Sequence, residues 1–151
     1  MKMWIEKRDI AFYNESKLKG IRLFVNKNIS QDIKEEIKSF LGWLRKRYFF
    51  PIRFKIIIKN ISYFLGSNEK DKDSYGDFYY GSEGYPEIWI AGGRIRNENK
   101  ENRIRRIIFM ILHELTHYFQ WFFYEFEKRT DRSLEIEANR WARYLLEEYF
   151  N

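Results

Sequence analysis

Short stretches of alternating or β-branched residues predict four strands in this chain. Residues 21–25 alternate apolar and polar side chains after a glycine, and residues 52–58 are rich in isoleucine. Two shorter runs, 77–80 and 87–90, are separated by segment 81–86, which contains glycine and proline. That spacing favours a turn, so we expect the two runs to pair as a hairpin.

Apolar side chains at three- and four-residue steps predict three helices. An amphipathic helix is expected over about 30–48, and Pro51 follows it and stops it. A longer helix is expected over about 101–126. Its apolar side chains lie around most of its circumference, which is typical of a helix covered by protein on most sides. The last helix is expected to begin at Asp131 or Ser133.

The order of these elements predicts the fold class. Strand, helix, strand, hairpin, helix and helix together favour an α+β fold in which helices pack against a small mixed sheet. The length of 151 residues, without an internal repeat, predicts one domain over residues 1–151. A hydrophobic content of 44% is enough for a core and excludes a disordered chain.

Composition excludes several kinds of site. The chain has no cysteine, so a disulfide framework, a thiolate zinc finger, an iron–sulfur site and a cysteine nucleophile are all excluded. The N-terminal residues lack the apolar stretch of a secretory signal, and no apolar run reaches the ~20 residues that span a bilayer. We therefore expect a soluble cytoplasmic protein without a membrane partner.

Net charge is less informative. The 28 Lys and Arg residues exceed the 22 Asp and Glu residues by six, and the densest basic stretches, 45–47 and 103–106, are short. Both fall within predicted helices, where a solvated face is the usual explanation. Nucleic-acid binding is therefore not the favoured function, although the charge leaves it open.

The stretch His113-Glu114-Leu115-Thr116-His117 carries the most chemical information. Side chains four residues apart lie on one side of a helix, so the two imidazoles can close on one metal ion. Glu114 points about 100° away from His113 around the helix axis, which suits a general base rather than a ligand. The apolar stripe of the same helix lies almost opposite the histidines, so we expect the histidines to face a cleft. They are the only two histidines in the chain, and their spacing favours a metal site over two isolated core residues.

A catalytic zinc needs a third protein ligand besides two histidines. Cysteine and further histidines are absent, so this ligand must be a carboxylate. The downstream candidates are Glu125, Glu127, Asp131, Glu135, Glu137, Glu147 and Glu148. Glu135 and Glu137 lie in the first turns of the last helix, where a short reversal of the chain can return them over the histidines. We choose Glu135 because it shares a helix side with Asn139, whose amide can hydrogen-bond a metal ligand, and Glu137 stays the alternative.

The motif at 113–117, followed by Glu-Ile-Glu-Ala-Asn-Arg-Trp-Ala at 135–142, resembles the gluzincin pattern of HExxH and a Glu-x-x-Ala-Asn/Asp helix. Among gluzincins it is most similar to the minigluzincins and to the ImmA/IrrE-type peptidases. Trp141 stands where the latter group usually has phenylalanine. The likeness covers about 113–146, and the order of the upstream elements agrees with a minimal zincin-like domain.

This resemblance implies a zinc-dependent endopeptidase that hydrolyses a protein or peptide substrate. His113, His117 and Glu135 would bind Zn²⁺, and Glu114 would act as general base and acid. The strand at 87–90 would border the cleft and pair with an extended substrate. The residue that steadies the transition state is not identified by the pattern, because the chain has no spare histidine and has eleven tyrosines.

Two other functions fit the same motif. One is a latent or inactive metal-binding module that acts through a protein partner. The other is a DNA-associated protease like the SprT group, although SprT-like proteins use a third histidine that this chain lacks. Two imidazoles and a carboxylate favour zinc, but the same ligands also suit iron(II) or cobalt.

Aromatic residues cluster at two further places in the sequence. The run 121–124 is expected to lie in the core under the last helix rather than to form an exposed docking patch. Tyr79, Tyr80 and Tyr85 either line the cleft or pack within the hairpin, and the sequence does not choose between these positions.

Overall fold

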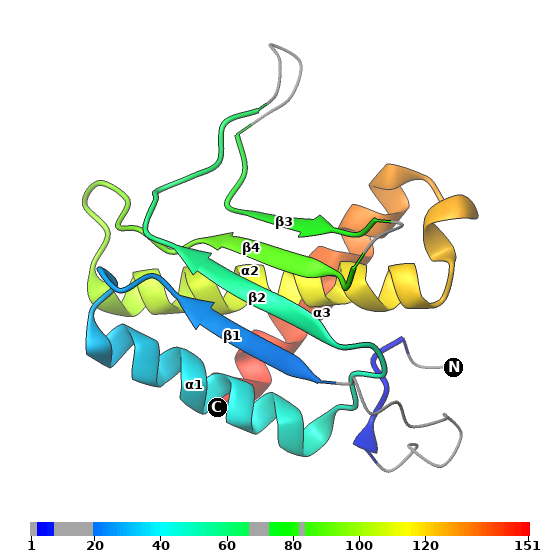
Figure 1. Ribbon diagram of the computed structural model, residues 1–151, viewed down its shortest axis with the longest axis horizontal. Coiled ribbons are helices and arrows are strands. Elements are labelled where there is room, and N and C mark those ends of the chain that lie inside the picture. Colours follow the sequence, from blue (N-terminus) through cyan, green and yellow to red (C-terminus); the bar gives the residue numbers. More distant parts are fainter. Residues whose placement is uncertain (1–2, 8–19, 67–72, 82–83) are drawn as a thin grey trace.

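The computed structural model describes residues 3–7, 20–66, 73–81 and 84–151 (Figure 1). These residues form a four-stranded mixed sheet with the strand order β1-β2-β4-β3. The strands are β1 (Ile21–Val25), β2 (Phe54–Lys59), β3 (Gly76–Tyr79) and β4 (Glu87–Ala91). β1, β2 and β4 run parallel to one another, and β3 is antiparallel to β4. The predicted α+β class and the predicted hairpin are therefore confirmed.

The helices cover one face of this sheet (Figure 1). Alternation along the strands explains why. Ile56 and Ile58 of β2 and Ile88 and Ile90 of β4 are buried, whereas Lys55, which precedes Ile56 in β2, is exposed. The helical elements are α1 (Gln31–Arg47), α2 (Lys100–Phe122), the short 3₁₀ helix η2 (Glu125–Glu127) and α3 (Asp131–Phe150). Among the described helices, none is both long enough and apolar enough to cross a membrane.

The long helix is shorter than the sequence predicts. It ends at Phe122 instead of near Phe126, and Tyr124 adopts a left-handed backbone conformation with φ of 58°. Such a conformation is unfavourable for a residue with a side chain, so helical periodicity alone does not predict it. The reversal turns the chain back, and α3 then packs along α2. The predicted core position of the run 121–124 holds for its first three residues, which are partly buried, but Tyr124 is 71% exposed.

The strand predicted to border a cleft occupies a different place in the sheet. β4 lies between β2 and β3 and pairs with both, so the expectation that 87–90 receives a substrate strand is wrong. Among the described residues, β3 forms that edge of the sheet and lies beside α2. Sequence could not rank the two strands, because a hairpin looks the same whichever arm faces outward.

Arg106 fixes α2 to the carboxyl end of β4. Its guanidinium donates hydrogen bonds to the carbonyl oxygens of Ala91 and Gly93, both at 2.7 Å, and pairs with Glu98 at 2.8 Å. Gly93 is required here, because a Cβ at this position would lie 2.6 Å from the backbone of Ile61. We call Arg106, Glu98 and the two carbonyl groups the arginine clamp.

Candidate metal centre

The middle of α2 carries polar side chains that are buried. Thr116 and Gln120 are fully buried, and His113, Glu114 and His117 are each less than 10% exposed. Buried polar groups are stable only when they are hydrogen-bonded or bind an ion. This buried group of polar side chains therefore marks the middle of α2 as a candidate functional site.

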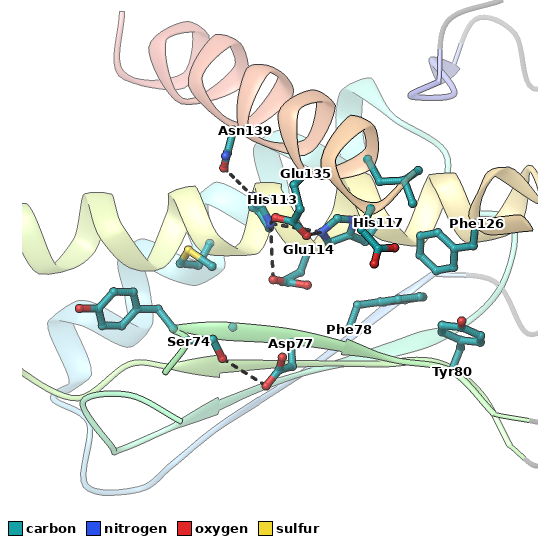
Figure 2. Close-up of a pocket in the computed structure, with 15 residues that line it drawn as sticks. Ser74, Asp77, Phe78, Tyr80, His113, Glu114, His117, Phe126, Glu135 and Asn139 are labelled. Atoms are coloured by element: carbon teal, nitrogen blue, oxygen red, sulfur yellow. Dashed lines mark hydrogen bonds and ion pairs between the residues drawn. The ribbon is translucent and has the colours of Figure 1, made fainter. Parts of the chain in front are cut away.

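His113, His117 and Glu135 come together across the contact between α2 and α3 (Figure 2). Glu135 Oε1 lies 2.9 Å from His117 Nε2, and Glu135 Oε2 lies 3.1 Å from His113 Nε2. The two Nε2 atoms are 3.2 Å apart, and the ligand atoms of the group all lie within 4.8 Å of one another. Two nitrogens and a carboxylate at these distances can hold a metal ion.

The start of α3 delivers Glu135 to this position. The Thr130 hydroxyl accepts a hydrogen bond from the Ser133 N–H, which caps the helix after the reversal at Tyr124. The prediction that a short reversal returns the first turns of the last helix over the histidines is confirmed. Asp131 lines the same cleft but is not a member of the ligand group.

Each histidine is held from behind by an amide oxygen. His113 Nδ1 lies 2.9 Å from Asn139 Oδ1, the amide that the sequence singled out, and His117 Nδ1 lies 2.7 Å from Gln120 Oε1. An acceptor at Nδ1 keeps the proton on that nitrogen, so Nε2 can offer its lone pair to a metal ion.

Glu137 is directed away from the histidines. Its Oε1 accepts hydrogen bonds from Arg129 at 2.7 Å and from Gln120 Nε2 at 2.9 Å. The structure thus brings Glu135 to the histidines and uses Glu137 to hold neighbouring side chains. Sequence reasoning did not identify Gln120 or Arg129. Gln120 could have been noticed as the polar residue three positions after His117, on the same side of the helix.

The charges of the group reinforce one another. Hydrogen bonds from His113 and His117 hold the pKa of the Glu135 carboxyl well below its ordinary value. Burial by itself would lower the pKa of His117, but the hydrogen bond to Glu135, the charge of Glu114 and the hydrogen bond to Gln120 together raise that pKa above its ordinary value. The group therefore favours a carboxylate in contact with positive charge.

Glu114 lies beside the ligand group and faces β3 (Figure 2). Its Oε1 is 3.9 Å from His113 Nε2. Burial raises the pKa of Glu114 to about 7, against the opposing effect of the two histidines. A Cβ on Gly76 would lie 3.2 Å from Glu114 Cγ, so the absence of a side chain at this position of β3 leaves room for the carboxylate.

A cleft of about 640 Å³ runs between α2, β3 and the start of α3. This volume falls within the range of about 300–1,000 Å³ that is usual for ligand sites. Figure 2 shows that Phe78, Tyr80 and Phe126 line the cleft beyond His117. Tyr80 therefore belongs to the cleft, whereas the Tyr79 ring packs on Trp89, with ring centroids 5.2 Å apart.

Alternate backbone groups of β3, a strand whose residues line the cleft, face the outer edge of the sheet. The Ala91 N–H donates to the Tyr75 carbonyl oxygen at 2.9 Å, so residues 75 and 91 form a hydrogen-bonded pair. Hydrogen-bonded and non-hydrogen-bonded pairs alternate along an antiparallel ladder, and Gly76 and Phe78 fall on the alternate positions. Their N–H and C=O groups therefore point away from β4, along an edge that pairs with no strand of the described residues.

No protein-family model, curated protein or solved structure matches this chain. The geometry of the site itself shows three side chains that can hold a metal ion, a buried carboxyl group beside them and the β3 edge of the sheet nearby.

Proposed function

We propose that the chain is a zinc-dependent endopeptidase of gluzincin type. The observation that carries the proposal is the contact of both Glu135 oxygens with His113 and His117, with the Glu114 carboxyl alongside. His₂Glu is a ligand set of catalytic zinc sites, in which a further position is left for water. When bound, zinc polarises a carbonyl group and lowers the pKa of water to about 7.

Glu114 supplies the proton transfers in this proposal. It takes a proton from the attacking water while the water oxygen forms a bond to the scissile carbonyl carbon. The same carboxyl then gives that proton to the amine nitrogen as the carbon–nitrogen bond breaks. Its position beside His113 and its burial between α2 and β3 support this role.

The edge of β3 supports an extended peptide as the substrate. The outward N–H and C=O groups of Gly76 and Phe78 can pair with a peptide backbone, as occurs when a strand is added to a sheet. A peptide bound there would run along the cleft past Glu114. This places the substrate strand on β3 rather than on β4.

The first test is zinc content measured by mass spectrometry of the purified protein. We expect about one zinc per chain in the unaltered protein and loss of zinc in His117→Ala and Glu135→Gln. Glu147→Gln is the matched control for Glu135→Gln. It removes an exposed carboxylate near the C-terminal end of α3, the helix that carries Glu135, and should retain zinc. Absence of zinc after loading at neutral pH would refute the proposal.

The second test is cleavage of an unfolded protein substrate by the zinc-loaded chain. We expect Glu114→Gln to retain zinc and to lose cleavage. A zinc-loaded protein that binds a partner but cleaves no protein would favour the latent metal-binding module instead. Cleavage that survives in Glu114→Gln at the unaltered rate would show a contaminating protease or a different mechanism.

A further inference from the structure

Gln120 occupies an unusual place behind the candidate metal ligands. It lies one turn after His117 on α2, is fully buried, and contacts α3 as well as the histidine. Its Oε1 lies 2.7 Å from His117 Nδ1. Its Nε2 donates to the Leu134 carbonyl oxygen at 3.0 Å and to Glu137 Oε1 at 2.9 Å.

These contacts permit only one orientation of the amide. The two partners of Nε2 are a carbonyl and a carboxylate, which accept hydrogen bonds and cannot donate them. Exchanging the oxygen and nitrogen of Gln120 would direct its oxygen at two acceptors. The oxygen must therefore face His117, and it accepts the proton on Nδ1.

The amide is itself held by charged groups outside the ligand set. Arg129 donates to Glu137 Oε1 at 2.7 Å, and its guanidinium also donates to the Ser133 hydroxyl at 2.9 Å. Arg129 precedes α3, so these hydrogen bonds connect the beginning of α3 to His117. The side chains along it come from α2, α3 and the segment between them.

We infer that Gln120 is a positioning residue for the metal site, because its oxygen holds His117 with Nε2 directed at the metal. The inference rests on the metal site of the proposed function and adds the group that orients one of its ligands. Partners of this kind are worth about 10- to 100-fold in metal affinity. The effect is on the zinc dissociation constant, and it does not require Gln120 to contact the metal or the substrate.

Two substitutions separate positioning from structural support. Gln120→Met removes the acceptor for His117 and both donor contacts at nearly equal volume. In Gln120→Glu one carboxyl oxygen still accepts from His117 Nδ1. The other oxygen faces Glu137 Oε1, so the two carboxyl groups must share a proton, and the hydrogen bond to the Leu134 carbonyl oxygen is lost. We expect the zinc dissociation constant, measured by chelator competition, to rise about 10- to 100-fold in Gln120→Met and to stay within about threefold of the unaltered protein in Gln120→Glu.

Thr116→Val is the matched control for loss of stability alone. It removes buried hydrogen bonds of α2 to Trp4 and to the Leu112 carbonyl oxygen. Thermal unfolding in excess chelator should show all three variants destabilised, while zinc affinity falls only in Gln120→Met. The visible spectrum of the cobalt(II)-loaded protein should change in Gln120→Met and be preserved in Gln120→Glu.

The inference is overturned if Gln120→Met binds zinc as tightly as the unaltered protein, or if Gln120→Glu loses as much affinity as Gln120→Met. Should Gln120→Met fail to fold, Gln120→Leu replaces it as the variant without an acceptor. A zinc dissociation constant that is about 10- to 100-fold higher in Gln120→Leu then supports positioning, and an unchanged constant refutes it. Failure of the unaltered protein to bind zinc would instead refute the proposed function.

Discussion

Two charged clusters on the same side of α2 differ in what surrounds them. In the arginine clamp, the Arg106 side chain donates to the carbonyl oxygens of Ala91 and Gly93 and to both oxygens of Glu98, so positive and negative groups satisfy one another. In the ligand group, His113 Nε2 and His117 Nε2 approach within 3.2 Å and both contact the same carboxylate. Two nitrogens of one kind so close together are stable only when positive charge, a proton or a metal ion, lies between them and the carboxylate.

This difference separates a structural ion pair from a binding site. The clamp lowers the pKa of Glu98, chiefly through the hydrogen bonds from Arg106, and its partners come from the sheet and the loop before α2. The ligand group draws its partners from α2 and α3, beside a cleft. The clamp should therefore govern stability, and the ligand group should govern zinc affinity and turnover.

The largest effect that tests this division is expected from Glu114→Gln. The amide keeps the volume of the carboxyl but cannot accept a proton from water, so kcat should fall by about 10²- to 10⁴-fold. Zinc content should be unchanged, because Glu114 is not a member of the ligand group. Steady-state proteolysis and mass spectrometry on the same preparation check both outcomes, and loss of zinc in this variant would contradict the assignment.

Arg106→Met should lower stability and leave the metal site intact. It leaves Glu98, whose side chain is only 11% exposed, without its cation, which is expected to reduce the free energy of unfolding by about 3–5 kcal/mol. Urea denaturation measures this change. Arg105→Met is the control for loss of an exposed arginine. It removes the exposed pair with Glu101 and the contact of the guanidinium with the Phe150 ring, and the expected change is about 1 kcal/mol. A weakened zinc affinity in folded Arg106→Met would contradict the assignment of the clamp to stability alone.

A side chain added to β3 should disturb turnover without disturbing zinc. In Gly76→Ala the new Cβ would lie 3.2 Å from Glu114 Cγ and 3.2 Å from Met110 Cε, so the carboxylate must shift by a few tenths of an ångström. We expect kcat to fall on the order of tenfold, because small displacements of catalytic groups strongly lower the rate of the chemical step. An unchanged zinc dissociation constant with a lower kcat supports this, whereas unchanged kcat shows that Glu114 adapts.

The smallest expected effect is the pH dependence that the clamp contributes. The pKa of Glu98 is lowered from its ordinary value of 4.5 in the folded protein, so the unfolded chain binds more protons and stability rises with pH. The contribution is fully present above 4.5 and is lost as the pH falls through the folded value. Urea denaturation in chelator between about pH 3 and 7 should show that stability depends less steeply on pH in Glu98→Gln than in the unaltered protein. Curves of equal slope would contradict the prediction.

Much of this arrangement could be predicted from local patterns in the sequence. Helical periodicity places His113 and His117 on one face, and the same reasoning pairs Glu135 with Asn139 on the last helix. The prediction of a helix to about 126 was wrong because Tyr124 adopts a backbone conformation that its side chain disfavours. Periodicity describes favourable local states and does not identify a strained residue.

The remaining differences come from contacts between distant segments. Whether β3 or β4 forms the sheet edge depends on which strand pairs with β2, and strand alternation does not carry that information. Gln120 and Glu137 are recognised as partners only after α2 and α3 are packed together. The zincin-like family and the activity stay predictions.

The arginine clamp also sets a limit on how the length of α2 can vary. Arg106 and His113 are seven residues apart, which is about two turns, so they lie within about 20° of each other around the helix axis. Inserting or deleting one residue between them would rotate His113 and His117 by about 100° relative to the clamped end and shift them by about 1.5 Å. The imidazoles would then no longer meet Glu135. The residues between them are mostly buried, so this stretch of the helix should tolerate apolar substitutions of similar volume but not changes in length.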